Sequence, residues 1–394
     1  MENTRTQIAA RLRDARQAIG LTQAQVAEQL GLHRPAVSEM EAGRRGITSE
    51  ELYELSRILG IPVSTLLEGG PEDQAEAVLF RKGEIAGPEA RLAVRRFVQR
   101  CVSEKELEEM FGIQLPAGGR PGYQVREPRS VWDAVMQGEE LAGRERRRLG
   151  LGLEPVRNPV ELLQQQGIRV GALEGVADLD LDGVYFESAT LGPCVGINSK
   201  RHPWTGFRIS FTVTHEYMHW LLHDTEAEQI HVQRFRKDLK EVRANSFAAA
   251  FLMPREAVTR YFLSTGLLTA NQQIATLRPA DIVRAMDYFG VSREALQYRL
   301  RALKLLPEPQ WEELRRLQFS VTTVAGALGL QLRAEFDLDD RFTELVVRAW
   351  TNGFITTGRA ADLFGVQIEE FHSMMSDAGL EADPGELFPE LAAA

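Results

Sequence analysis

The sequence is poor in cysteine, in long apolar runs and in net positive charge, and each shortage excludes a class of protein. Cys101 and Cys194 are the only cysteines among 394 residues, which excludes a disulfide scaffold and is typical of a reducing cytoplasm. No run approaches the ~18 apolar residues of a membrane span, and the charged start MENTRTQIAARLRDARQ is unlike a signal peptide. We therefore expect a cytoplasmic protein with no membrane partner.

Basic residues are outnumbered, with 46 Lys and Arg against 56 Asp and Glu and a net charge of −10. A protein that coats nucleic acid without sequence preference is more basic, so any DNA contact must come from a local patch. The 44% apolar and 26% charged fractions are ordinary for a globular chain. The length predicts two to four domains.

Apolar residues recur mostly at helical spacing, and short β-rich runs are confined to the middle of the chain. We therefore predict an α+β fold that is mostly helical. It divides into five short helices over 1–70, a helical connector over 71–150, a domain with a small β-sheet over 151–305 and a helical C-terminal region over 306–394. The predicted strands lie at 168–173, 183–186 and 194–197, and three helices follow near 206–223, 236–252 and 254–264.

The segment His215-Glu216-Tyr217-Met218-His219 is an HExxH motif. On a helix, positions i and i+4 share one face, so both imidazoles can bind one ion while Glu216 reaches a metal-bound water. Zinc lowers the pKa of that water toward ~7, and the carboxylate takes its proton as hydroxide attacks a peptide carbonyl. The motif predicts a zinc-dependent peptidase with Glu216 as the base and manganese as the alternative metal.

A catalytic site of this kind needs a third protein ligand, and the residues alone leave several candidates. They are His223, Asp224, Glu226, Glu228, His231 and Glu241. Three ligands on one straight helix cannot converge on one ion, which weakens His223, whereas a carboxylate from the next helix can reach it. Glu241 opens such a segment, rich in small residues that suit close packing.

Two blocks of sequence, FTVTHEYMHWLLH at 211–223 and EVRANSFA from Glu241 followed by LMP at 252–254, resemble the ImmA/IrrE family of zinc endopeptidases over about 150–305. The resemblance implies a zincin-like, gluzincin-type domain with Glu241 as the third ligand beside His215 and His219. It also implies cleavage of a helix-turn-helix repressor after DNA damage or related stress, with single-stranded DNA as an activator. Tyr217-Met218 replaces the commoner leucine- or isoleucine-glycine pair and is expected to reshape the pocket.

Residues 6–68 resemble Xre-type, lambda-repressor-like helix-turn-helix domains. The residues that carry the resemblance are Leu21-Thr22-Gln23, Val26-Ala27, Leu30-Gly31, Val37-Ser38, Glu41 and Gly43. Thr22 can cap the second helix and Gly31 permits the tight turn. The resemblance implies that a helix starting near His33 enters the major groove of operator double-stranded DNA, as part of a homodimer that reads two half-sites.

The predicted DNA contacts are the outward residues His33, Arg34, Pro35 and Ser38, and the phosphate-binding residues Gln23, Arg44 and Arg45. Residues 1–68 hold eight Arg and no Lys against nine Asp and Glu, so this segment is close to neutral. Weak operator binding that depends on dimerisation is therefore more plausible than tight binding by a monomer. The alternative is a helical module for protein interaction.

Two further features each allow a functional and an ordinary interpretation. Cys194 could act as a regulatory zinc ligand that silences the enzyme, because thiolates bind zinc at ~2.3 Å. Free cysteine is more often a small buried apolar residue. The basic run Arg144–Arg148 could bind a nucleic-acid signal, or it could be an ordinary solvated helix end.

The leading hypothesis is a stress-responsive transcriptional regulator whose zinc endopeptidase cleaves a helix-turn-helix repressor, itself or a paralogue. Cleavage would derepress a stress, mobile-element or anti-phage operon. The alternative is a transcription factor whose peptidase-like domain senses a small molecule, such as an acyl thioester, without proteolysis. A third hypothesis is an antitoxin whose helical tail binds a toxin. The intact HExxH motif together with Glu241 favours the first.

Overall fold

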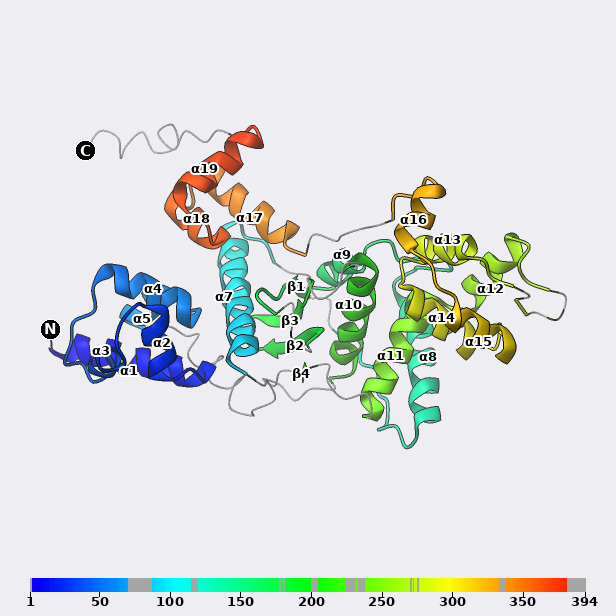
Figure 1. Cartoon of the computed structure of the whole chain (residues 1–394), viewed down its shortest axis with the longest axis horizontal. Coiled ribbons are helices and arrows are strands. Elements are labelled where there is room, and N and C mark those ends of the chain that lie inside the picture. The colour runs from blue at the N-terminus through cyan, green and yellow to red at the C-terminus, as the bar shows by residue number, and fades with distance from the viewer. Residues whose placement is uncertain are drawn as a thin grey trace.

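The computed structural model describes residues 2–69, 87–114, 120–176, 179, 181–199, 205–223, 231–232, 238–269, 271, 273–274, 276–332 and 338–380. Figure 1 shows an elongated molecule, with an N-terminal helical head at one end and a small sheet between layers of helices in the middle. The predicted α+β, mostly helical fold is confirmed. Within the described ranges, no helix combines the length and apolar character that crossing a membrane requires.

The head contains the five predicted helices. They are α1 (Glu2–Ile19), α2 (Gln23–Gln29), α3 (Arg34–Glu41), α4 (Ser49–Leu59) and α5 (Val63–Glu68). As predicted, the Thr22 side chain caps α2, accepting a hydrogen bond from the backbone N–H of Gln25. Gly31 has φ +67°, the left-handed conformation that the turn between α2 and α3 requires. These two signals fix the angle at which α3 leaves α2.

The sheet is four-stranded, in the order β1-β3-β2-β4. Its strands are β1 (Arg169–Ala172), β2 (Gly183–Ser188), β3 (Gly192–Ile197) and β4 (His231–Val232). β1 runs parallel to β3, whereas β2 runs antiparallel to both β3 and β4. The three predicted strands are confirmed, and β4 was missed because two residues give no periodic pattern. Successive side chains alternate between the faces, so Val184, Phe186 and Cys194 face one side and Tyr185, Val195 and Ile197 the other.

On one face of the sheet, the strands contact α9 (Pro159–Gln165) and α10 (Thr205–Leu222), and α10 contains the HExxH motif. α11 (Leu239–Leu252) packs against α10, and α8 (Val131–Arg148) packs against α11. α8 and α11 approach very closely at Gly138, where an added Cβ would lie 2.5 Å from the carbonyl oxygen of Arg243 and 2.7 Å from the nitrogen of Phe247. Only glycine therefore permits this packing, which holds α11 beside α10.

The opposite face of the sheet is covered by α7 (Pro88–Met110). Phe97, Val98 and Cys101 pack there against Val184 and Phe186. α7 also holds the head, because the buried Arg95 donates hydrogen bonds to carbonyl oxygens at the ends of α1 and α4, at 2.9 Å to Ala15 and 3.1 Å to Leu59. The segment predicted as a helical connector over 71–150 thus contributes α7, which packs on the sheet, and α8, which packs on α11.

The remaining helices form two groups. The first contains α12 (Arg255–Ser264), α13 (Pro279–Phe289), α14 (Arg293–Ala302), α15 (Glu308–Arg316) and α16 (Val321–Ala327), and it extends the core around α11. The second contains α17 (Asp340–Thr351), α18 (Thr357–Phe364) and α19 (Ile368–Asp377), with a small core of its own against Leu107 of α7. The predicted C-terminal region over 306–394 thus divides between two places in the fold (Figure 1).

Candidate metal centre and DNA-binding face

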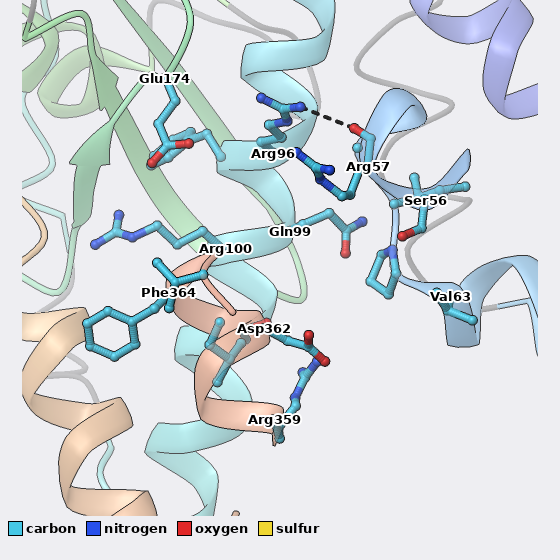
Figure 2. Close-up of a pocket in the computed structure, with 18 of the residues that line it drawn as sticks. Ser56, Arg57, Val63, Arg96, Gln99, Arg100, Glu174, Arg359, Asp362 and Phe364 are labelled. Carbon is cyan, nitrogen blue, oxygen red and sulfur yellow. Dashed lines mark hydrogen bonds between the residues drawn. The ribbon is translucent and has the colours of Figure 1, made fainter. Parts of the chain in front are cut away.

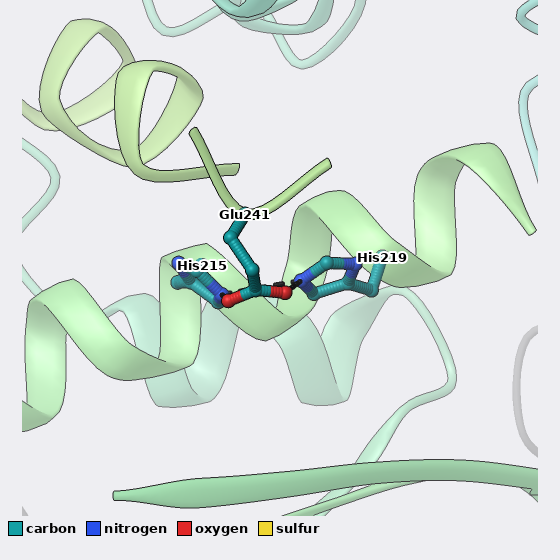
Figure 3. Close-up of side chains that lie close together, drawn as sticks. All are labelled: His215, His219 and Glu241. Atoms are coloured by element: carbon teal, nitrogen blue, oxygen red, sulfur yellow. Dashed lines mark hydrogen bonds and ion pairs between the residues drawn. The ribbon is translucent and has the colours of Figure 1, made fainter. Parts of the chain in front are cut away.

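His215 and His219 lie one turn apart on the same side of α10, and Glu241 reaches them from the first turn of α11 (Figure 3). Glu241 Oε2 lies 3.3 Å from His215 Nε2, and Glu241 Oε1 lies 3.4 Å from His219 Nε2. The two Nε2 atoms are 3.1 Å apart. All three residues are buried, and their ligand atoms lie within 4.8 Å of one another. Two imidazoles and one carboxylate are a donor set that zinc accepts in catalytic sites, so the residues fit the metal.

Of the other candidates for the third ligand, His223 is described by the structure, and it does not join this group. His223 follows the end of α10 in the left-handed conformation, with φ +52°. Burial lowers the pKa of His223, and the nearby guanidinium of Arg120 lowers it further. Asp224, Glu226, Glu228 and the side chain of His231 lie outside the described residues. Glu241 is thus the carboxylate that the structure places beside both histidines.

Asn245, one turn after Glu241 on α11, orients His215. Its Oδ1 lies 3.1 Å from His215 Nδ1. An Nδ1–H donated to this oxygen leaves Nε2 deprotonated and directed toward the metal position, the usual function of an outer-sphere partner. The sequence analysis missed Asn245, although its i+4 spacing from Glu241 placed the two on one helix face.

Glu216 is fully buried and lies between α10 and β2. An added Cβ at Gly183 of β2 would lie 3.2 Å from Glu216 Oε1 and 3.0 Å from Thr212 Cγ2. The absent side chain at Gly183 therefore leaves room for this carboxylate. The sequence pattern gave no signal for this role of Gly183.

Tyr217 points away from the metal ligands and toward α8. Its hydroxyl donates to Glu145 Oε1 at 2.5 Å, and the hydroxyl of Tyr123 donates to Glu145 Oε2 at 2.7 Å. Arg148 also donates to this fully buried carboxylate, at 2.6 Å. Burial raises the pKa of Tyr217, and Glu145 raises it further, so the hydroxyl keeps its proton. Tyr217 thus anchors α10 to α8, and the expectation that the Tyr217-Met218 pair reshapes the pocket stays a prediction.

The basic run Arg144–Arg148 is largely structural. Arg146 is buried and donates to the carbonyl oxygens of Phe251 at 2.7 Å and Glu154 at 2.6 Å, and burial lowers its pKa to about 10. Arg144 lies over the ring of Tyr123, 4.6 Å from its centroid. Arg144 and Arg146 therefore stabilise the packing of α8, whereas Arg147 is exposed, and binding of a nucleic-acid signal by this run stays a prediction.

Cys194 lies on the face of the sheet that α7 covers, whereas the HExxH helix packs against the other face. It is completely buried beside Cys101. Burial raises the pKa of the Cys194 thiol, and the Cys101 thiol raises it further. The hypothesis that Cys194 is a regulatory zinc ligand is therefore not supported: its side chain projects away from the histidines, and the ordinary interpretation of a buried cysteine fits.

The predicted DNA-binding residues gather at the start of α3 and just beyond its end. His33, Arg34 and Pro35 are exposed, and Ser38 is half-buried on the same helix. Arg44 is exposed, but Arg45 donates to both carboxylate oxygens of Glu51, at 2.6 and 3.1 Å. A free guanidinium for phosphate is thus present at Arg44, whereas Arg45 is already paired.

Gln23 has an internal contact that the sequence did not indicate. Its Nε2 donates to Glu41 Oε2 at 2.9 Å, and Arg16 donates to both oxygens of the same carboxylate, at 2.6 and 3.0 Å. The amide group of Gln23 therefore points inward and stabilises the head. A phosphate contact from Gln23 remains a prediction, and it would compete with this bond.

The fold and the two sites define a DNA-binding head joined to a metallopeptidase-like domain. Comparison with protein families agrees, since residues 12–66 match the family model described as helix-turn-helix and residues 163–301 match the IrrE N-terminal-like domain of the M78 peptidases. The chain is therefore a helix-turn-helix regulator fused to an M78 peptidase-like domain. No match was found among the curated proteins.

Proposed function

We propose that the protein is a cytoplasmic transcriptional regulator and a zinc-dependent endopeptidase whose substrate is a helix-turn-helix repressor, either a second copy of this chain or a paralogue. The observation that carries the proposal is the buried group of His215, His219 and Glu241, with the buried Glu216 next to His215 in α10. Manganese is the alternative metal. Stress-triggered cleavage, with single-stranded DNA as the activator, rests on the family resemblance.

Each residue of the site has a different role in peptide hydrolysis. When bound by His215, His219 and Glu241, zinc supplies Lewis-acid chemistry that polarises a peptide carbonyl and lowers the pKa of water toward ~7. Glu216 takes the proton of the attacking water and delivers it to the leaving amide nitrogen. The burial of Glu216 keeps bulk water from its carboxylate. Asn245 holds the ring of His215 in the orientation that binding requires.

The position of the head favours cleavage in trans. The head docks on α7 through Arg95, on the face of the sheet opposite α10 (Figure 1). α7 and the sheet therefore separate the peptide bonds of the head from Glu216 of the same chain. A second copy of the chain, brought close in an operator-bound dimer, offers its head without undocking the first.

A mixed incubation tests this function. An epitope-tagged, full-length Glu216→Gln variant serves as the substrate for untagged wild-type protein, with zinc or manganese and single-stranded DNA present. We expect specific fragments of the tagged chain by mass spectrometry, and no fragments from Glu216→Gln alone, a loss of about 10³-fold or more in rate. Operator binding by Glu216→Gln should equal that of wild type.

Glu140→Gln is the matched control, because that carboxylate is 73% exposed on α8. It should cleave at the wild-type rate. If Glu216→Gln cuts itself as fast as wild type does, Glu216 is not the base. If wild type with bound metal cuts no helix-turn-helix protein, the peptidase-like domain is better explained as a sensor.

A further inference from the structure

A cavity of about 630 Å³ lies where the head, α7, the end of β1 and α18 meet, away from the metal centre (Figure 2). Its volume falls within the range of roughly 300–1,000 Å³ that small-molecule sites occupy, and such sites favour boundaries between domains. The head contributes Arg57 and Val63, α7 contributes Arg96 and Gln99, and α18 contributes Leu363. A molecule bound here would touch all of these elements together.

The wall formed by the head and α7 carries two arginines, and the described residues neutralise them only in part. Figure 2 shows Arg57 and Arg96 next to one another, with Arg96 Nη2 donating to the carbonyl oxygen of Arg57 at 3.1 Å. No carboxylate among the described residues forms an ion pair with Arg96. Arg57 pairs with Glu54 only at the surface, at 3.3 Å with both side chains exposed. Two adjacent like charges repel, so a bound anion would stabilise this arrangement.

Two other arginines of the cavity are already paired. Arg100 Nη2 lies 3.0 Å from Asp339 Oδ1, and Arg359 Nη2 lies 3.4 Å from Glu106 Oε2. The carboxylates of Glu174 and Asp362 also line the cavity, so its cationic part is the wall at Arg57 and Arg96, where Arg96 has no ion-pair partner among the described residues. Guanidinium groups bind phosphate through parallel N–H bonds, so a phosphate group matches this pair better than a single carboxylate does.

Gln99 adds a hydrogen-bond donor one helix turn from the arginine wall. Its side chain lines the cavity, and its buried Nε2 has no hydrogen-bond partner within the described part of the chain. Figure 2 shows its side chain directed from α7 toward the head. Buried amide groups are nearly always bonded, so an acceptor on a ligand would satisfy this donor. Val63 and Leu363 line the same cavity with half-buried apolar side chains, which suit a carbon skeleton.

We propose that this cavity binds a small phosphorylated molecule, with its phosphate on Arg57 and Arg96, an acceptor on Gln99 and its carbon skeleton between the head and α18. Because Arg96 and Arg95 are neighbours on the helix that holds the head, an occupied cavity fixes the head against α7. The site is thus an effector site, independent of the metal centre and of peptide cleavage.

Titration calorimetry of the full-length, metal-free protein tests the proposal, since chelation removes the other phosphate-binding centre. The probes are AMP and inorganic phosphate. We expect one saturable site for at least one probe, and tighter binding of AMP if the carbon skeleton contributes. No saturable binding of either probe up to about 5 mM would overturn the proposal.

Variants locate the binding site. Arg96→Ala and Arg57→Glu should each weaken binding at least tenfold, and Arg57→Glu keeps the backbone carbonyl that Arg96 uses. Arg13→Ala is the matched control, because Arg13 is an exposed arginine of the head that does not line the cavity. A loss with Arg13→Ala, or unchanged binding in Arg57→Glu with an unaltered unfolding temperature, would place the phosphate elsewhere and contradict the assignment.

Discussion

The head and the peptidase-like domain each bury a glutamate, and they neutralise it in different ways. Glu41 of the head accepts two hydrogen bonds from Arg16 and one from Gln23, so its charge is balanced within the chain. Glu241 instead lies against two imidazoles, which must be neutral to bind a metal. The head is therefore complete without a ligand, whereas the metal centre depends on a cation from solution.

The largest expected effect tests the head. Arg16→Met should lower the free energy of unfolding of the head by about 3–5 kcal/mol, because Glu41 would keep a buried charge without its cation. Thermal unfolding followed by circular dichroism measures this. Arg13→Met is the control, since Arg13 is half-exposed and pairs with the exposed Asp14 at 3.6 Å. If both variants lose equal stability, Glu41 is not held as a buried ion.

Metal removal should affect only the other domain. With free zinc at 100 times its dissociation constant, chelation should lower the free energy of unfolding of the peptidase-like domain by about 2.7 kcal/mol. The head transition should not move. Glu241→Gln should bind zinc about 100-fold more weakly or worse, and its unfolding should no longer respond to a chelator. A chelator effect of equal size on Glu241→Gln would remove Glu241 from the ligand set.

A smaller effect is expected where a buried glutamate has several donors. Tyr217→Phe should lower the free energy of unfolding of the peptidase-like domain by about 1–2 kcal/mol, because Glu145 keeps Tyr123 and Arg148 as donors. Zinc affinity should change less than threefold. Tyr298→Phe, at a 56% exposed residue, should have no effect. A loss of zinc binding in Tyr217→Phe would mean that Tyr217 belongs to the metal centre after all.

The parts of the fold that were predictable depend on local patterns. The HExxH spacing placed His215, Glu216 and His219 on one helix face, and the Thr22 cap and the left-handed Gly31 followed from turn chemistry. The spacing alone left Glu241 among six candidates, because a ligand from another helix depends on tertiary packing. The family resemblance selected it, and the structure places it beside both histidines.

The unpredicted features all involve two elements that are distant in sequence. Asn245 and Gly183 act on α10 from α11 and β2, and Glu145 holds Tyr217 from α8. Side chains alternate between the two faces of β3, but the sequence does not indicate which face packs against the HExxH helix. It therefore could not exclude Cys194 from the metal site. The amphipathic pattern within 71–150 showed that its helices are half-buried, but it could not show that α7 packs on the sheet and α8 on α11.

Because α7 contacts the head on one side and the sheet on the other, both contacts depend on the order of residues along this helix. Its 23 residues present arginines to the head and apolar residues to the sheet. Inserting one residue in the middle of α7 would rotate the rest of the helix by about 100°. Either the arginines would then miss the head or the apolar residues would miss the sheet. A different DNA-binding domain could replace the head only if its helix ends placed carbonyl groups where Arg95 can donate to them. We therefore expect recombination between related proteins to exchange the head together with α7.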